Sequence, residues 1–148
     1  MNLRDRLTRG FLAGIFGGIP MNIFDLISFY LGISELRFID WAAIMIYGVK
    51  PGNIPETVFA LLAQIIFSGV LGIIFAYLIT LVNSVNYLLK GAIFGSFTWF
   101  LLYGISLLFK VEATIPLHLD TAASDFLGSI IYGLVLAKTL YWFSVKLN

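Results

Sequence analysis

The chain has 148 residues, of which 60% are hydrophobic and 11% are charged, and its mean hydropathy is +0.99. About a quarter of the residues in a soluble globular domain are charged, so this composition excludes an ordinary soluble domain and indicates a membrane protein. The net charge of +1 gives no basic surface for nucleic acid, which is not an expected partner. The absence of cysteine excludes disulfides, cysteine nucleophiles and cysteine metal ligands.

Four stretches are long and apolar enough to cross a bilayer, which requires roughly 20 mostly apolar residues per helix. In chain order they are Phe11 to Leu31, Thr57 to Val82, Leu88 to Phe109 and Thr121 to Phe143. We therefore expect an all-α integral membrane protein with four transmembrane helices. Because no linker or low-complexity run divides the chain, residues 1–148 are expected to form a single membrane domain in the lipid bilayer.

The segment between the first two spans predicts a different element. Its apolar part, Trp41 to Tyr47, is too short to cross a bilayer. Gly48 and Pro51 follow and are typical helix-ending residues. We expect a short interfacial or re-entrant helix here, within an insertion that covers residues 33–56.

Positive side chains indicate the orientation, because Lys and Arg near span ends are retained on the cytoplasmic side. Six lie at one set of span ends and three at the other: Arg4, Arg6, Arg9, Lys90, Lys138 and Lys146 against Arg37, Lys50 and Lys110. The sequence therefore predicts a multi-pass protein of the cell membrane with both termini in the cytoplasm.

Two halves of the chain share a pattern. Arg9 to Phe16 and Lys90 to Phe97 both read Arg/Lys-Gly-x-Leu/Ile-x-Gly-x-Phe at the start of a span. Later in each half, Gln64, Ser68, Gly72 and Ala76 align with Asp125, Ser129, Gly133 and Ala137. We expect two parallel-repeat helical hairpins, 9–82 with the insertion 33–56 and 88–143, related by an axis along the membrane normal.

Small residues recur every four positions along the spans. They allow helix backbones to approach closely, which is how helices associate in lipid. Packing within the bundle is the expected role, with homo-oligomer contacts as the alternative. The residues concerned are Gly10, Gly14, Gly18, Ser68, Gly72, Gly91, Gly95, Ser129 and Gly133.

Polar side chains lie at similar depth in three of the spans: Asn22, Asp25, Gln64 and Asp125. A charged side chain costs about 2.5–3.5 kcal/mol at the centre of an inserting helix, so such groups face the bundle or a wet cavity. Pro20 is expected to kink the first span below Asn22 and open space there. We expect these four side chains to line an outward-facing intramembrane pocket.

Several functions fit such a pocket. It can bind or pass protons, cations or a small solute, or its polar groups can only fix the packing of the bundle. The chain can instead be a structural or assembly subunit of a larger membrane complex. A metal site formed by His118, Asp120, Asp125 and Asp25 is a further alternative, although one histidine in the whole chain is a weak signal. The sequence names no cofactor.

An enzyme is the less favoured interpretation. His118 is the single histidine, and no G-x-S-x-G, H-E-x-x-H or P-loop pattern accompanies it. Asp25 and Asp125 could form an aspartyl-protease-like pair, but they lack the glycine-flanked motifs expected of an intramembrane aspartyl protease.

Overall fold

The structure, a computed structural model, describes residues 5–114 and 118–146. These residues form the helices α1 (Arg6–Tyr30), α2 (Phe38–Tyr47), α3 (Ile54–Leu78), α4 (Tyr87–Leu108) and α5 (Leu119–Lys146), together with the short 3-10 helix η1 (Glu112–Thr114). Four of them, α1, α3, α4 and α5, are long and apolar enough to cross a membrane. The predicted all-helical fold, with four spans and a shorter helix between the first two, is confirmed.

Side-chain oxygens satisfy backbone donors at the start of three long helices. The first N–H groups of a helix have no partner within it, and short polar side chains commonly accept their hydrogen bonds. Asp5, Asn53 and Asn86 each accept a hydrogen bond from the backbone N–H three residues later, at 2.9–3.2 Å. The polar residues between the apolar runs therefore fix where α1, α3 and α4 begin.

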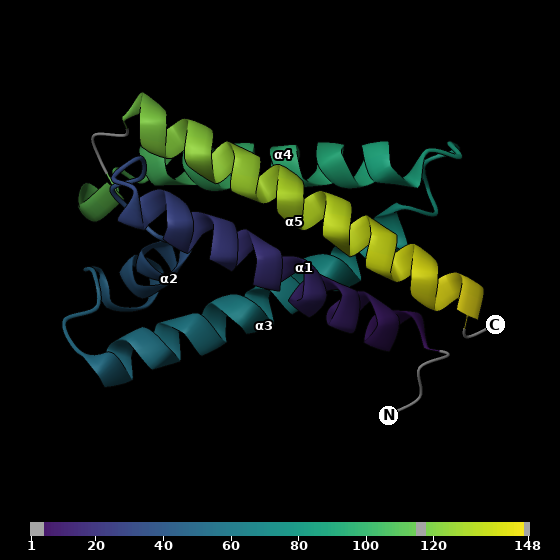
Figure 1. The fold of residues 1–148 in the computed structure, drawn as a ribbon, viewed down its shortest axis with the longest axis horizontal. Coiled ribbons are helices and arrows are strands. Elements are labelled where there is room, and N and C mark those ends of the chain that lie inside the picture. The colour runs from purple at the N-terminus through teal and green to yellow at the C-terminus, as the bar shows by residue number, and fades with distance from the viewer. Residues whose placement is uncertain (1–4, 115–117, 147–148) are drawn as a thin grey trace.

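The four long helices form a bundle in which α1 and α5 are central. The most extensive contacts join α1 with α3, α4 with α5, and α1 with α5. The helices α3 and α4 meet where Phe75 packs against Phe94, with ring centroids 5.1 Å apart. Figure 1 shows α1 beginning and α5 finishing at one end of the bundle, called here the terminal end, and α2 lying at the other, called the α2 end.

The short helix α2 is partly enclosed by the bundle. Ile39, Ala43 and Ile44 are buried, and the helix packs against α3 and touches η1. It stops where the sequence predicts, because Gly48 follows Tyr47 with a φ of 81°, a left-handed conformation that glycine adopts without strain. One face of α2 therefore belongs to the core of the α2 end.

Glycines allow the α1 and α3 backbones to approach closely. A Cβ atom added at Gly10 would lie 2.8 Å from Ala76 Cβ and 2.9 Å from the Gly72 carbonyl oxygen. One added at Gly14 would overlap the Ser68 carbonyl oxygen. These contacts are closer than real Cβ atoms make, so a side chain at either position would require α1 and α3 to move apart.

The contact between α4 and α5 is also formed by glycine and other small residues. A Cβ at Gly91 would overlap the Gly133 carbonyl oxygen and lie 2.6 Å from Ala137 Cβ. A Cβ at Gly95 would overlap the Ser129 carbonyl oxygen. The small residues predicted to pack helices therefore lie at the two contacts within the hairpins.

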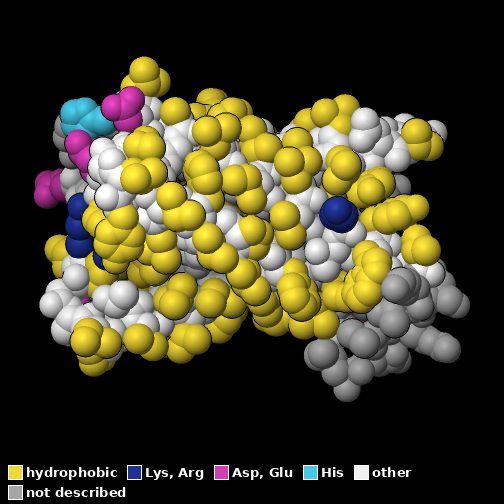
Figure 2. Space-filling view, viewed as in Figure 1, with side chains coloured by type: hydrophobic (Ala, Val, Ile, Leu, Met, Phe, Trp, Pro, Cys, Tyr) yellow, Lys and Arg dark blue, Asp and Glu magenta, His cyan; other side chains and the backbone are white. Residues whose placement is uncertain are grey.

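The surface of the bundle is mostly apolar along its length. Figure 2 shows hydrophobic side chains over the middle of this face, with acidic, histidine and basic side chains at the α2 end and one basic side chain nearer the terminal end. Large apolar side chains on every long helix are exposed, among them Ile23, Ile66, Phe100 and Trp142. Such a surface is stable in lipid and not in water, so these helices are consistent with a multi-pass membrane protein.

Candidate functional site

A cavity of about 360 Å³ lies between α3 and α4 in the half of the bundle nearer α2. Its floor is formed by α1 and α5, through the buried side chains of Met21, Asp125, Ser129 and Tyr132. The volume is within the roughly 300–1,000 Å³ of small-molecule sites. The cavity lies on the α2 side of the contact between Phe75 and Phe94, where α3 and α4 are farther apart.

The mouth of the cavity faces outward from the bundle. Four of the residues that line it, Met45, Ile46, Phe67 and Ile105, are between 40% and 64% exposed. They belong to α2, α3 and α4, and Phe67 lies near the middle of its helix. The opening is therefore bordered by apolar side chains on the surface of the bundle.

Most polar groups of the cavity wall already have hydrogen-bond partners. The hydroxyl groups of Ser68, Thr98 and Ser106 each donate to the carbonyl oxygen four residues earlier in their own helix, at 2.9–3.0 Å. The Tyr132 hydroxyl donates to the Ser68 carbonyl oxygen at 2.6 Å. Asp125 and Gln64 add a carboxylate and an amide to the mostly apolar wall, and the buried indole Nε1 of Trp99 has no hydrogen-bond partner among the described residues.

Asp125 is 1% exposed and lines the cavity from α5. Its Oδ2 accepts hydrogen bonds from the Tyr103 hydroxyl at 2.6 Å and from Trp41 Nε1 at 3.2 Å. Its Oδ1 is buried and has no hydrogen-bond partner among the described residues. A buried oxygen without a donor costs free energy, so Oδ1 is an acceptor available to a bound molecule.

Gln64 lines the cavity from α3, and Asn22 of α1 lies behind it. Asn22 Nδ2 donates to Gln64 Oε1 at 3.0 Å and to the Gly18 carbonyl oxygen at 2.8 Å. Because the Gln64 oxygen already accepts a hydrogen bond, its amide NH2 is the group left to donate. Asn22 is not part of the cavity wall and instead orients Gln64.

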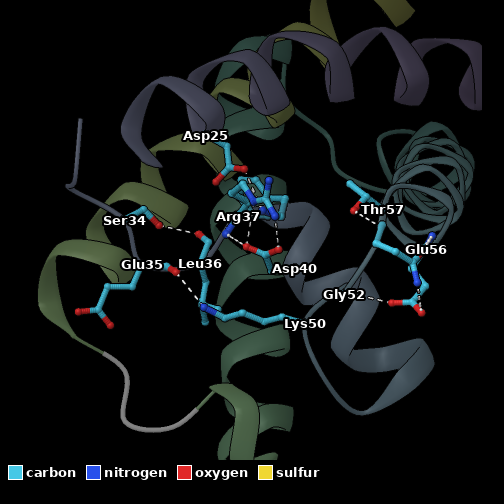
Figure 3. A network of polar contacts seen from close by, with 12 residues as sticks. Asp25, Ser34, Glu35, Leu36, Arg37, Asp40, Lys50, Gly52, Glu56 and Thr57 are labelled. Atoms are coloured by element: carbon cyan, nitrogen blue, oxygen red, sulfur yellow. Dashed lines mark hydrogen bonds and ion pairs between the residues drawn. The ribbon is translucent and has the colours of Figure 1, made fainter. Parts of the chain in front are cut away.

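Asp25 is also 1% exposed, but it lies outside the cavity wall and contacts α2. Its Oδ2 accepts a hydrogen bond from the backbone N–H of Phe38, the first residue of α2, at 2.8 Å. Figure 3 shows the Asp25 carboxylate directed at this start of α2. A carboxylate there is favoured by the positive end of the helix dipole, so Asp25 holds α2 in place.

An ion pair stabilises the same helix start. Arg37 donates to both carboxylate oxygens of Asp40, from Nε at 3.0 Å and from Nη2 at 2.7 Å (Figure 3). The Asp40 oxygens also raise the pKa of the Arg37 guanidinium above its ordinary value, mainly through these hydrogen bonds. The Arg37 guanidinium lies 5.0 Å from the centre of the Phe29 ring.

The two intramembrane aspartates come from adjacent helices and both reach α2. Ser28 and Ser124, one turn or less from the aspartates, are joined by a hydrogen bond of 2.6 Å between their hydroxyls. Both aspartates are 1% exposed. They hold α2 at two points, Asp25 at the Phe38 N–H and Asp125 at the Trp41 indole.

The predicted pocket residues are thus divided between two places. Gln64 and Asp125 line the cavity, whereas Asn22 and Asp25 lie beside it and position Gln64 and α2. Ser68, Gly95 and Ser129, predicted from spacing as packing residues, also contribute to the cavity wall. Pro20 lies inside α1, which is helical on both sides of it.

The proposed metal ligands are not assembled. His118 and Asp120 are exposed, and His118 Nε2 lies 3.8 Å from Glu35 Oε2. Asp25 and Asp125 are buried instead among the partners given above. In the part of the chain that the structure describes, no three His, Asp or Glu side chains gather as a metal-ion site.

Sequence reasoning missed the aromatic side chains around Asp125. Trp41 lines the cavity from α2, and Trp99 and Tyr103 line it from α4. Trp99 and Tyr103 are four residues apart and share a helix face, which was a usable signal. Trp41 lies in the short helix that the sequence predicts to be interfacial or re-entrant, and nothing in the sequence places this helix against Asp125.

Comparison of the chain with protein-family models, with curated proteins and with solved structures finds no match. The functional argument therefore rests on the geometry of the site.

Proposed function

We propose that this protein binds a small amphipathic molecule in the cavity between α3 and α4. The carrying observation is a volume of about 360 Å³ with mostly apolar walls, a mouth bordered by exposed apolar side chains, and Asp125 and Gln64 inside. Apolar walls with a few convergent polar groups are typical of small-molecule sites. The apolar part of the ligand would contact the walls, and its polar end would meet Asp125.

The same geometry is less suited to passing free ions. An ion that crosses a membrane needs polar groups or water along its path. Here the hydroxyl groups of Ser68, Thr98 and Ser106 donate to backbone carbonyls. The opening is bordered by the apolar side chains of Met45, Ile46 and Phe67. Of the ligands expected from the sequence, protons, cations and small solutes, the cavity therefore favours a small solute with a polar or cationic end.

The orientation of the site follows from the distribution of positive residues. With both termini in the cytoplasm of a cell-membrane protein, the α2 end faces outside. The cavity then opens toward the outer leaflet, and its ligand would arrive from the lipid or the outer face.

We infer further that the two hairpins are repeats. In the sequence alignment Gly14 corresponds to Gly95, and Ser68 to Ser129. A Cβ at either glycine would overlap the carbonyl oxygen of the serine in its own hairpin. This equivalence of contacts supports a duplication. The insertion that contains α2 occurs only in the first hairpin, and α2 borders the cavity between α3 and α4.

Fluorescence quenching by 1-bromodecane tests the proposal. Of the three tryptophans, Trp41 and Trp99 line the cavity and Trp142 does not, so a Trp142→Phe background reports on the cavity. We expect saturable quenching of the tryptophan fluorescence in lipid nanodiscs. This quenching should be lost in Ala63→Phe, because the larger side chain fills part of the cavity. Ala123→Phe, on an exposed position of α5, should keep it. Equal, unsaturable quenching in both variants would contradict the proposal.

A subunit role remains the competing function and has its own measurement. Native mass spectrometry after mild solubilisation would show a single chain or a homo-oligomer if the protein acts by itself. A stoichiometric foreign protein would favour a subunit of a larger membrane complex.

A further inference from the structure

Three aromatic rings gather beside Asp125 in the cavity wall. The centroid of the Tyr103 ring lies 5.1 Å from that of Trp41 and 4.8 Å from that of Trp99, with interplanar angles of 34° in both pairs. All four residues line the cavity, from α2, α4 and α5. Aromatic faces carry negative partial charge and attract cations, most strongly where water is excluded.

The hydrogen bonds of Asp125 leave one side of the carboxylate for a ligand. Both protein donors, the Tyr103 hydroxyl and the Trp41 indole N–H, bind the same oxygen, Oδ2. The other oxygen, Oδ1, is buried without a partner among the described residues. Tyr103 and Trp41 thus fix the carboxylate among the rings while Oδ1 is left to accept from, or pair with, a bound group.

Among the described residues, no positively charged side chain donates a hydrogen bond to Asp25 or Asp125. Arg37 is held by both oxygens of Asp40, so that pair is neutral as a unit. Asp25 accepts from a backbone N–H, and Asp125 accepts from a phenol and an indole. None of these donors carries a positive charge. A cationic ligand at Oδ1 would therefore supply a positive partner that favours the ionised form of Asp125, whereas an anionic ligand would favour the protonated form.

We propose that the ligand is a lipophilic organic cation whose ammonium group binds beside Asp125 among Trp41, Trp99 and Tyr103. This inference rests on the proposed function and adds the chemistry of the polar end. The alkyl or aryl part would lie against the apolar wall toward Phe67 and Ile105. The trimethylammonium group of a lipid headgroup has the same chemistry, but it is accompanied by a phosphate whose negative charge has no positive partner among the described residues of the cavity wall, so an organic cation without a phosphate is the better match.

The test compares decyltrimethylammonium with decanol by isothermal titration calorimetry. The protein is held in zwitterionic nanodiscs, and titrations of empty nanodiscs are subtracted. Because both probes have the same decyl group, the difference between their affinities reports on the head group. We expect decyltrimethylammonium to bind about tenfold more tightly or better, the range that desolvated cation–aromatic contacts supply. Equal affinities would overturn the cation inference.

Two substitutions with matched controls locate the effect. Asp125→Asn should lower the affinity for decyltrimethylammonium at least about tenfold and leave decanol unchanged, whereas Asp120→Asn, an exposed carboxylate on the same helix, should change neither. If Asp125→Asn does not fold, Trp99→Leu provides the second measurement. This substitution should lower the affinity for decyltrimethylammonium and leave that for decanol unchanged. Trp142→Leu is its control and should change neither affinity. A loss that is equal for both probes would overturn the inference.

The outcomes separate this inference from the proposed function. If Ala63→Phe abolishes the binding of both probes but their affinities are equal, the cavity binds small molecules and the cation inference fails. If Ala63→Phe changes neither probe, the cavity is not the binding site and both proposals fail. A phosphatidylcholine molecule retained in native mass spectra and displaced by decyltrimethylammonium would support ammonium recognition and identify a lipid headgroup as its source.

Discussion

The packing of α4 against α5 can be tested with one substitution at two glycines of α4. A Cβ at Gly95 would overlap the carbonyl oxygen of Ser129 on α5, whereas a Cβ at Gly104 would meet nothing within 4 Å. Both positions are inside the same helix. Gly95→Ala and Gly104→Ala therefore make the same chemical change with and without a steric conflict.

The expected magnitudes follow from two opposing effects. Replacing glycine with alanine inside a helix stabilises it by about 1 kcal/mol, and this applies to both variants. Overpacking costs typically about 1–3 kcal/mol, and it applies only at Gly95. The obstructing atom there belongs to the backbone, so α4 and α5 must move apart. We expect Gly104→Ala to gain about 1 kcal/mol and Gly95→Ala to be less stable than Gly104→Ala by about 1–3 kcal/mol.

Unfolding in mixed micelles, with circular dichroism as the readout, measures the free energy of unfolding of both variants. Gly14→Ala, which would overlap the Ser68 carbonyl oxygen in the first hairpin, should be destabilised to a similar extent as Gly95→Ala. Equal stabilities for Gly95→Ala and Gly104→Ala would refute the argument, because they would mean that α4 and α5 do not approach at Gly95.

Two further predictions concern α2 and the orientation. Asp25→Ala removes the acceptor of the Phe38 N–H, a loss of about 0.5–2 kcal/mol, so hydrogen exchange of α2 should accelerate about 2- to 30-fold. Asp5→Ala, which removes an exposed cap of α1, is the control; unchanged exchange in α2 would show that Asp25 does not hold it. Cysteines at Asn53 and Asn86, both exposed helix caps at opposite ends of the bundle, should react differently with an impermeant maleimide in intact cells. We expect labelling only at position 53. Labelling only at position 86 would show that the protein has the opposite orientation.

The buried carboxylate in the first span illustrates the limit of sequence reasoning. Its cost in lipid predicted that Asp25 faces protein, and the side chain is 1% exposed. Its depth also suggested a pocket shared with Asp125, yet Asp25 binds the Phe38 N–H outside the cavity wall. Depth along a helix can be counted from the sequence. The partner of a side chain depends on the path of a separate segment, here the loop that carries α2 back toward α1.

The sequence by itself determined the four spans, the short helix and the glycines at helix contacts. A membrane-crossing helix must satisfy its own backbone hydrogen bonds, so its length and apolar character are local properties that can be read from the chain. Close helix contacts require small residues at fixed intervals, which are equally local, as at Gly14 and Gly95. Only the tertiary structure decided that α3 and α4 separate, that α2 covers the space between them, and that Trp41, Trp99 and Tyr103 surround Asp125. These features depend on how each helix is rotated and tilted against its neighbours, which is set by the packing of the whole bundle.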